Sequence, residues 1–193
     1  MISKRARRGV WFGRFLRLTI INGALAAGWT VFIVWPWLTP PPSVILTEGS
    51  AGTWLPFGYL LFLILGVVAM AVTPIFYYFL EVLQGRVYYG FRSLLATGHL
   101  VFWEVGVVGA TFLMMYAGYR GGVGLLATSE GGGGLTASQV HAEILQYYID
   151  PIFAFSLIAI VGAMLGGLGY ALSERGLAEK IAVLVRSESE RAA

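Results

Sequence analysis

The stretch "GHLVFWEVGVVGATFLMMYAG", from Gly98 to Gly118, decides the class of this protein, because it is long and apolar enough to cross a lipid bilayer. A helix needs roughly 20 apolar residues to span a hydrocarbon core about 30 Å thick. The same stretch carries His99, Trp103 and Glu104 within six residues. It predicts a membrane helix and raises a question: do these side chains form a functional site, or do they pack between helices?

The rest of the chain is also apolar. Of its 193 residues, 58% are hydrophobic and only 12% are charged, whereas a soluble domain carries about 25% charged residues. We therefore predict an all-α integral membrane four-helix bundle, a single domain over residues 1–193 with short amphipathic surface helices. Its expected segments are spans at 18–37, 57–83, 94–119 and 152–172, outer loops at 38–56 and 120–151, and an inner amphipathic tail at 173–193.

Positive charge predicts the orientation of the spans. All 13 lysines and arginines except Arg120 lie in the N-terminal segment, in the connection between the second and third spans, or in the C-terminal tail. Since basic residues mark the cytoplasmic side, we expect a multi-pass protein of the cell membrane with both termini in the cytoplasm.

The N-terminal segment is strongly basic and is followed by an apolar run of 20 residues. That run has no small-residue cleavage motif, so we interpret it as a retained first helix and not as a signal peptide. A basic segment beside a membrane helix is typical of contact with anionic lipid headgroups, and we favour lipid over nucleic acid as its partner. The expected headgroup ligands are Lys4, Arg5, Arg7 and Arg8.

The outer loops are rich in proline and glycine, which predicts an extended first loop and a flexible "SEGGGG" run in the second. Thr136 and Gln139 have the spacing of a capping box and predict a short helix on the outer surface. Asp150 and Pro151 then predict the N-cap and first position of the fourth span.

The sequence gives no set of cofactor ligands. Without cysteine, thiolate-held iron–sulfur clusters and c-type haem attachment are excluded. From His99 to Tyr119 is roughly 30 Å of helix, so His99 and His141 cannot hold one haem within a monomer. We expect no cofactor of its own and no metal site.

Glu104 is the residue of the third span whose burial in a membrane costs the most free energy. It is expected about 15 Å deep, where an ionised acid costs about 2.5 kcal/mol or more, so we expect it to carry a proton and donate a hydrogen bond. It is either a proton-relay or quinone-contact site, or a hydrogen bond between helices. His99 does not share its helix face, but Trp103 shares the face of His99.

Two further patterns concern packing. Glu81 is expected to pair with Arg86 or Arg92, and Pro74 to kink the second span. Small residues predict close approach of the third and fourth helices, at Gly106, Gly109, Gly162 and Gly166.

Residues 57–172 resemble the late transmembrane helices of subunit I of the haem–copper oxidases. In that family a Gly-Arg turn precedes a helix that begins His-Phe-Trp, followed by a glycine, a Thr-Phe pair, a methionine and a glycine-arginine loop. The matching residues here are Gly85-Arg86, His99, Phe102-Trp103, Gly106, Thr111-Phe112, Met115 and Gly118–Gly122.

The chain departs from that family at the residues through which the family binds haem and copper. The helix that matches 57–83 carries haem-binding histidines in the family but has none here, and the copper ligands are absent. The family's Pro-Arg-Arg is reduced to Tyr119-Arg120-Gly121, and the histidine that matches His99 is not a metal ligand. The resemblance implies a non-catalytic relative or an accessory subunit, with haem in a partner subunit.

We therefore expect an accessory or structural subunit of a respiratory electron-transfer complex of the oxidase type. Its expected partners are other membrane subunits and lipid, and nucleic acid is not expected. One alternative is a small quinone-handling or proton-conducting protein that uses Glu104. Another is a standalone multi-pass transporter.

Overall fold

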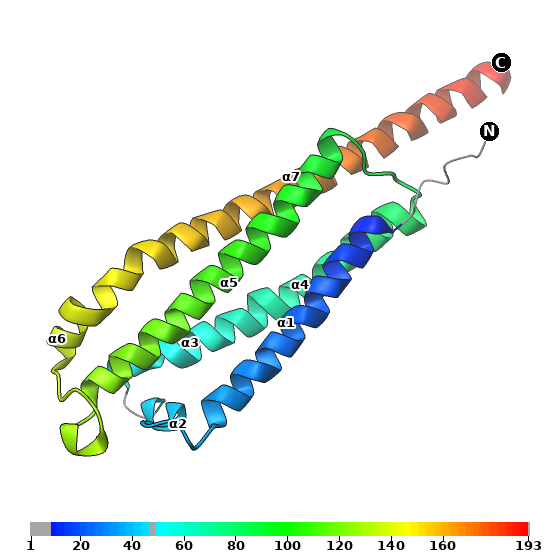
Figure 1. Cartoon of the computed structure of the whole chain (residues 1–193). Coiled ribbons are helices and arrows are strands. Elements are labelled where there is room, and N and C mark those ends of the chain that lie inside the picture. Colours follow the sequence, from blue (N-terminus) through cyan, green and yellow to red (C-terminus); the bar gives the residue numbers. More distant parts are fainter. Residues whose placement is uncertain (1–8, 47–48, 193) are drawn as a thin grey trace.

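The computed structural model describes residues 9–46 and 49–192, with side chains described as far as Ser173, and every regular element in this part of the chain is a helix. Four helices within it are long and apolar enough to cross a membrane. They lie side by side in Figure 1, which confirms the predicted all-α membrane bundle. The four candidate spans are Val10–Val34, Ser50–Leu83, Phe91–Leu125 and Ala137–Ser173.

Helix α1 (Val10–Val34) begins eight residues before the predicted apolar span. It follows Gly9, whose backbone is left-handed with φ 79°. It ends at Val34, because the next residue, Trp35, precedes proline and avoids the helical region, with ψ of 115°. The early start places Arg14 inside the helix, with its guanidinium carbon 4.4 Å from the centre of the Trp11 ring.

The second span is a composite helix. It contains two π-helical segments, and Pro74 lies inside one of its α-helical segments. The loop before it was expected to be extended, but it forms a short helix, α2 (Pro42–Ile45). Proline explains this difference, because its fixed φ suits the first turn of a helix. The segments of the span are η1 (Ser50–Thr53), α3 (Trp54–Leu61), η2 (Phe62–Ala69), α4 (Met70–Tyr78) and η3 (Phe79–Leu83).

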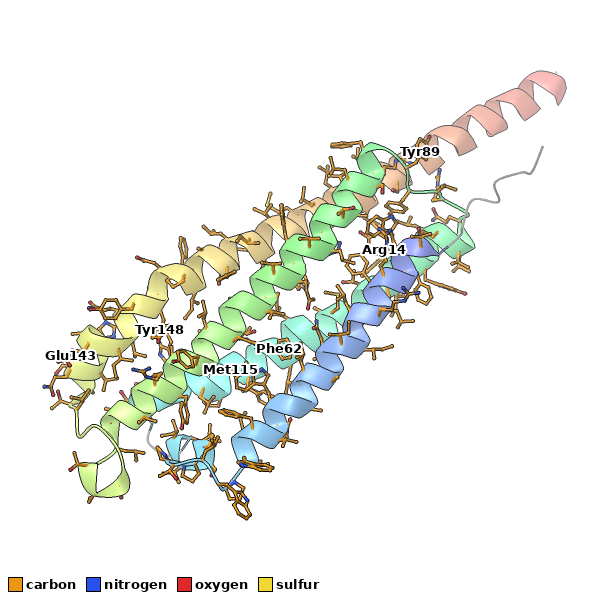
Figure 2. The ribbon with its side chains drawn as sticks, viewed as in Figure 1. Arg14, Phe62, Tyr89, Met115, Glu143 and Tyr148 are labelled. Carbon is orange, nitrogen blue, oxygen red and sulfur yellow. The ribbon has the colours of Figure 1, made fainter. Side chains whose placement is uncertain are left out.

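Helix α5 (Phe91–Leu125) lies at the centre of the bundle, between the second span and the fourth (Figure 1). Figure 2 shows Phe62 and Met115 between α5 and the second span, and both side chains are fully buried. Close approach here depends on Gly58, where an added Cβ would lie 2.8 Å from the backbone nitrogen of Met115. Gly118 is tighter still, because its added Cβ would lie even closer to the backbone nitrogen of Leu55.

The glycine run after α5, for which we expected a flexible loop, is packed back against the end of that helix. Its amides donate to carbonyls that the helix end leaves free: Gly133 to Val123 at 3.0 Å and Leu135 to Gly124 at 2.8 Å. An added Cβ at Gly132 would collide with Leu126, so side chains would prevent this approach. One turn of 3-10 helix, η4 (Thr128–Glu130), lies between the end of α5 and the glycine run.

The last helical run begins at the predicted capping box, which is confirmed. The Thr136 side chain accepts from the backbone amide of Gln139, and the Gln139 side chain accepts from the backbone amide of Thr136. The helix start expected at Asp150 and Pro151 is not present, because both residues lie inside one continuous helix. Pro151 removes only one amide donor, and membrane helices tolerate such a loss. The run consists of α6 (Ala137–Val140), the π-helical η5 (His141–Leu145) and α7 (Gln146–Ala192).

The two ends of the bundle differ. Helix α1 begins and α7 ends at one end, whereas α2 and the loop after α5 lie at the other (Figure 1). Arg14 and Tyr89 lie at the first end, and Glu143 and Tyr148 at the second (Figure 2). Helix α7 packs extensively on α5 and on the adjoining η5. Residues of α7 and of the second span together line a groove between these two spans.

Candidate functional site

Glu104 forms a hydrogen bond that joins three helical segments. The Nδ2 atom of Asn22 on α1 donates to Oε2 of Glu104 on α5 at 3.1 Å. The same Nδ2 donates to the carbonyl oxygen of Gly66 in η2 at 2.7 Å. The amide has two hydrogens, one for each acceptor. Glu104 therefore accepts this bond, whereas we had expected it to donate one.

Asn22 was not among the predicted site residues. Its side chain is fully buried, and its Oδ1 has no hydrogen-bond partner among the described residues. A signal was available in the sequence, because Asn22 is the only amide side chain in the apolar run 18–37. Polar groups inside a membrane helix usually face the bundle interior and find a partner on a neighbouring helix.

The carbonyls of the second span are the acceptors for several side chains. Pro74 has no amide hydrogen, so the Met70 carbonyl four residues earlier loses its helical donor. The Thr19 hydroxyl of α1 lies 2.8 Å from this oxygen and can donate to it. In η2, the Leu65 carbonyl accepts from Nε1 of Trp103 at 3.3 Å. Side chains of α1 and α5 thus compensate for the irregular backbone of the second span.

His99 lies in an aromatic cluster near the end of the bundle where α1 begins. Its Nδ1 atom is 3.2 Å from the hydroxyl oxygen of Tyr77. The Phe15 ring stacks on Tyr77 at 4.6 Å between centroids and lies 4.9 Å from the His99 ring. The expected common face of His99 and Trp103 is confirmed by their rings, which are 6.4 Å apart. His141 lies in η5, beyond the other end of α5.

Glu81 caps the first helix. The backbone amides of Trp11 and Phe12 donate to its Oε2 atom at 2.9 Å and 3.1 Å. The carboxyl is almost fully buried, and it meets the positive end of the helix dipole and two amides that have no partner within α1. The expected ion pair with Arg86 or Arg92 was therefore wrong. Among the described residues these two amides, and not an arginine side chain, are the hydrogen-bond donors to its carboxyl.

Glycines allow α5 and α7 to approach closely. An added Cβ at Gly106 would collide with the backbone of Ala159, and one at Gly162 with the backbone of Trp103. The two remaining predicted packing glycines meet side chains: Gly109 meets the Phe155 ring and Gly166 meets the His99 ring. All four lie where the fourth span contacts the third.

The groove between α7 and the second span contains two cavities. The first, which we call the His99 cavity, has a volume of about 330 Å³. It is lined by Ala69, Thr73, Phe76, Tyr77, Leu80, Tyr88, His99, Trp103, Ala163, Gly166, Gly167 and Tyr170. Burial raises the pKa of the Tyr88 phenol, so this group is neutral near pH 7.

The second, the Gly106 cavity, has a volume of about 380 Å³. Its lining includes Leu61, Leu65, Gly106, Ala110, Ala159 and Met164. It shares Trp103 and Ala163 with the His99 cavity, so the two follow one another along α5. Glu104 lines neither cavity.

Two predicted features lie at the limits of the described structure. The proposed headgroup ligands Lys4, Arg5, Arg7 and Arg8 fall outside the described residues. The tail at 173–193 continues α7 as a helix as far as Ala192, but its side chains after Ser173 also lie outside the description. Within the described residues, no three histidine, cysteine or acidic side chains are grouped to hold a metal ion.

Comparison with protein families, curated proteins and solved structures found no match to this chain. The likeness to oxidase subunit I stays a prediction from the residues quoted above. The polar link, the aromatic cluster and the two cavities are therefore interpreted from their own chemistry.

Proposed function

We propose that this chain is a non-catalytic accessory subunit of a respiratory electron-transfer complex of the oxidase type. It lies in the cell membrane with both termini in the cytoplasm and stabilises neighbouring catalytic subunits. It binds no cofactor of its own, and any haem belongs to a partner subunit. The distribution of basic residues supports the orientation, and the resemblance of residues 57–172 supports the kind of complex.

The observation that carries this proposal is the open groove along α5. Helix α7 packs on α5 but has no extensive contact with the second span, and the Gly106 cavity between them is lined by apolar and small residues. Membrane helices associate where small residues let their backbones approach. A helix of a partner subunit would fill this groove and bury a surface that one copy of the chain leaves open.

Isolation from native membranes tests the proposal. A tagged chain, solubilised in mild detergent, is expected to carry with it subunits that show a haem absorbance spectrum. Ala110→Trp would fill the Gly106 cavity and should reduce the recovered haem at least several-fold. Ala27→Trp, on an exposed position of α1, is the matched control and should not. Recovery of a lone chain, with electron transfer unchanged in a strain that lacks it, would contradict the proposal.

A second candidate is proton conduction through Glu104, and a specific observation favours it. The Oδ1 atom of Asn22 is buried beside Glu104 and has no partner among the described residues. Such an atom is a place for a water molecule that could pass a proton to the carboxyl. Vesicles that contain the purified chain and a trapped pH dye would show proton uptake, and Glu104→Gln should abolish it. Equal uptake by both proteins would exclude this role.

A further inference from the structure

The His99 cavity has the features of a binding site for a membrane-soluble ligand. Its volume of about 330 Å³ is within the range of about 300–1,000 Å³ that is typical of small-molecule sites. Thr73 and the exposed Phe76 contribute to it from α4, and the exposed Gly167 contributes from α7. These two helices do not pack extensively on each other. Phe76 and Gly167 both lie within candidate spans, so in a membrane these exposed positions face the hydrocarbon region.

The lining excludes several ligand classes. Among the described residues the lining contains no acid, lysine or arginine, so a phosphate or carboxylate headgroup would find no counter-charge from them. Glu81 follows the lining residue Leu80 in the chain, but its carboxyl accepts from the amides at the start of α1. Aromatic rings form a large part of the wall, and the Phe76 and Tyr170 rings meet edge to face at 5.7 Å. These features favour a neutral, flat and largely apolar ligand.

The hydrogen-bonded pair of Tyr77 and His99 contributes a polar group to the wall of the cavity. The Tyr77 hydroxyl lies 3.2 Å from Nδ1 of His99. We assign the hydroxyl as the donor of this pair, and with that assignment a neutral His99 carries its hydrogen on Nε2. His99 lines the cavity, and Nε2 forms no hydrogen bond with any described residue. With this assignment the lining includes an imidazole N–H donor among mainly apolar and aromatic side chains, which fits a carbonyl acceptor.

We propose that the His99 cavity binds the ring of an isoprenoid quinone, with Nε2–H of His99 donating to a ring carbonyl and the tail passing out between α4 and α7. The inference concerns binding and is independent of the accessory role proposed above. It also differs from a quinone contact at Glu104, since Glu104 does not line this cavity.

Gly167 provides a direct test. An added Cβ there has no heavy atom within 4 Å, although the residue lines the cavity, so a large side chain would fill the space without displacing a helix. Gly28 on α1 is likewise open, is exposed and lines neither cavity. Gly167→Phe is therefore the blocking variant, and Gly28→Phe is its matched control.

The measurement uses the full chain in phosphatidylcholine nanodiscs, titrated with decylbenzoquinone while tryptophan fluorescence is recorded. Trp103 lines the cavity, so bound quinone should quench it in a saturable way. We expect saturable quenching in the parent chain and in Gly28→Phe, and its loss in Gly167→Phe. His99→Leu should weaken binding about tenfold, the effect of about 1.4 kcal/mol. His99→Gln keeps an N–H donor and should weaken binding less.

A second measurement needs no variant. A photoreactive azidoquinone should label the parent chain within 69–80 and 163–170, and decylbenzoquinone should compete with it. Saturable quenching that survives in Gly167→Phe, or labelling spread over all the lipid-facing helices, would overturn the proposal. So would quenching of Trp103 by bromine-labelled phosphatidylcholine that quinone does not displace, because the cavity would then hold an acyl chain.

Discussion

The two sides of α5 are held in different ways. Toward α1 and the second span, polar side chains bond to backbone atoms and to each other, as Asn22 does with Gly66 and Glu104. Toward α7, glycines bring the two backbones together, as Gly106 and Gly162 do. The first side depends on groups that are present and the second on side chains that are absent. Loss of a group should therefore weaken the first side, and added bulk should weaken the second.

The largest expected effect is on the glycine side. Gly162→Leu would place its Cβ against the backbone of Trp103, which cannot move aside as a flexible side chain could. We expect a loss of about 3 kcal/mol or more in the free energy of unfolding. Gly28→Leu, with open space around its Cβ, should change it little. Thermal unfolding of the two variants in detergent, followed by circular dichroism, compares them, and equal midpoints would contradict the close-approach interpretation.

The next effect is on the polar side, at Glu81. Glu81→Ala removes the acceptor for the amides of Trp11 and Phe12, and we expect a cost of about 2 kcal/mol. Glu81→Gln retains a neutral acceptor oxygen and should lose less. Hydrogen exchange at these two amides reports the effect locally. Unchanged protection in Glu81→Ala would show that the carboxyl does not cap α1.

Thr19 tests the compensation for a proline. Thr19→Val keeps the shape of the side chain but removes the donor to the Met70 carbonyl, and should cost about 1 kcal/mol. If Pro74 is first replaced by alanine, the carbonyl regains its helical donor, and Thr19→Val should then cost much less. A double-mutant cycle on unfolding free energies measures this coupling, and strict additivity of the two changes would refute it.

The smallest expected effect on stability is at Glu104. In Glu104→Gln, the new amide oxygen can still accept from Nδ2 of Asn22, so the free energy of unfolding should change by less than about 0.6 kcal/mol. Asn22→Leu removes both donated bonds and should be more destabilising. Denaturant unfolding of both variants checks this order. A reversed order would mean that the Glu104 carboxyl has a stabilising role that an amide cannot replace.

The sequence alone was sufficient for features that depend on local pattern. The four apolar runs, the capping box at Thr136 and the glycines at the contact of the third and fourth spans are of this kind. A hydropathy pattern reflects the composition of each stretch, and small-residue spacing needs only one helix to be recognised.

The partners of the polar residues were not predictable in this way. Glu81 bonds to residues about 70 positions earlier, and Asn22 to one 82 positions later. Charge proximity along the chain suggested Arg86 for Glu81, but the fold brings free amides closer. The helix start predicted at Asp150 and Pro151 was wrong for a related reason, because a single missing amide is a weak signal against a long apolar helix.

The cap on α1 has a consequence for synthesis. A ribosome releases α1 first, and at that moment the carboxyl of Glu81 has not yet been made. The amides of Trp11 and Phe12 must then be solvated by water or lipid headgroups until the second span has crossed the membrane. The start of the first helix is thus completed by the end of the second, so the two spans form the earliest unit that can mature together. A chain truncated between them should leave α1 less deeply and less firmly inserted.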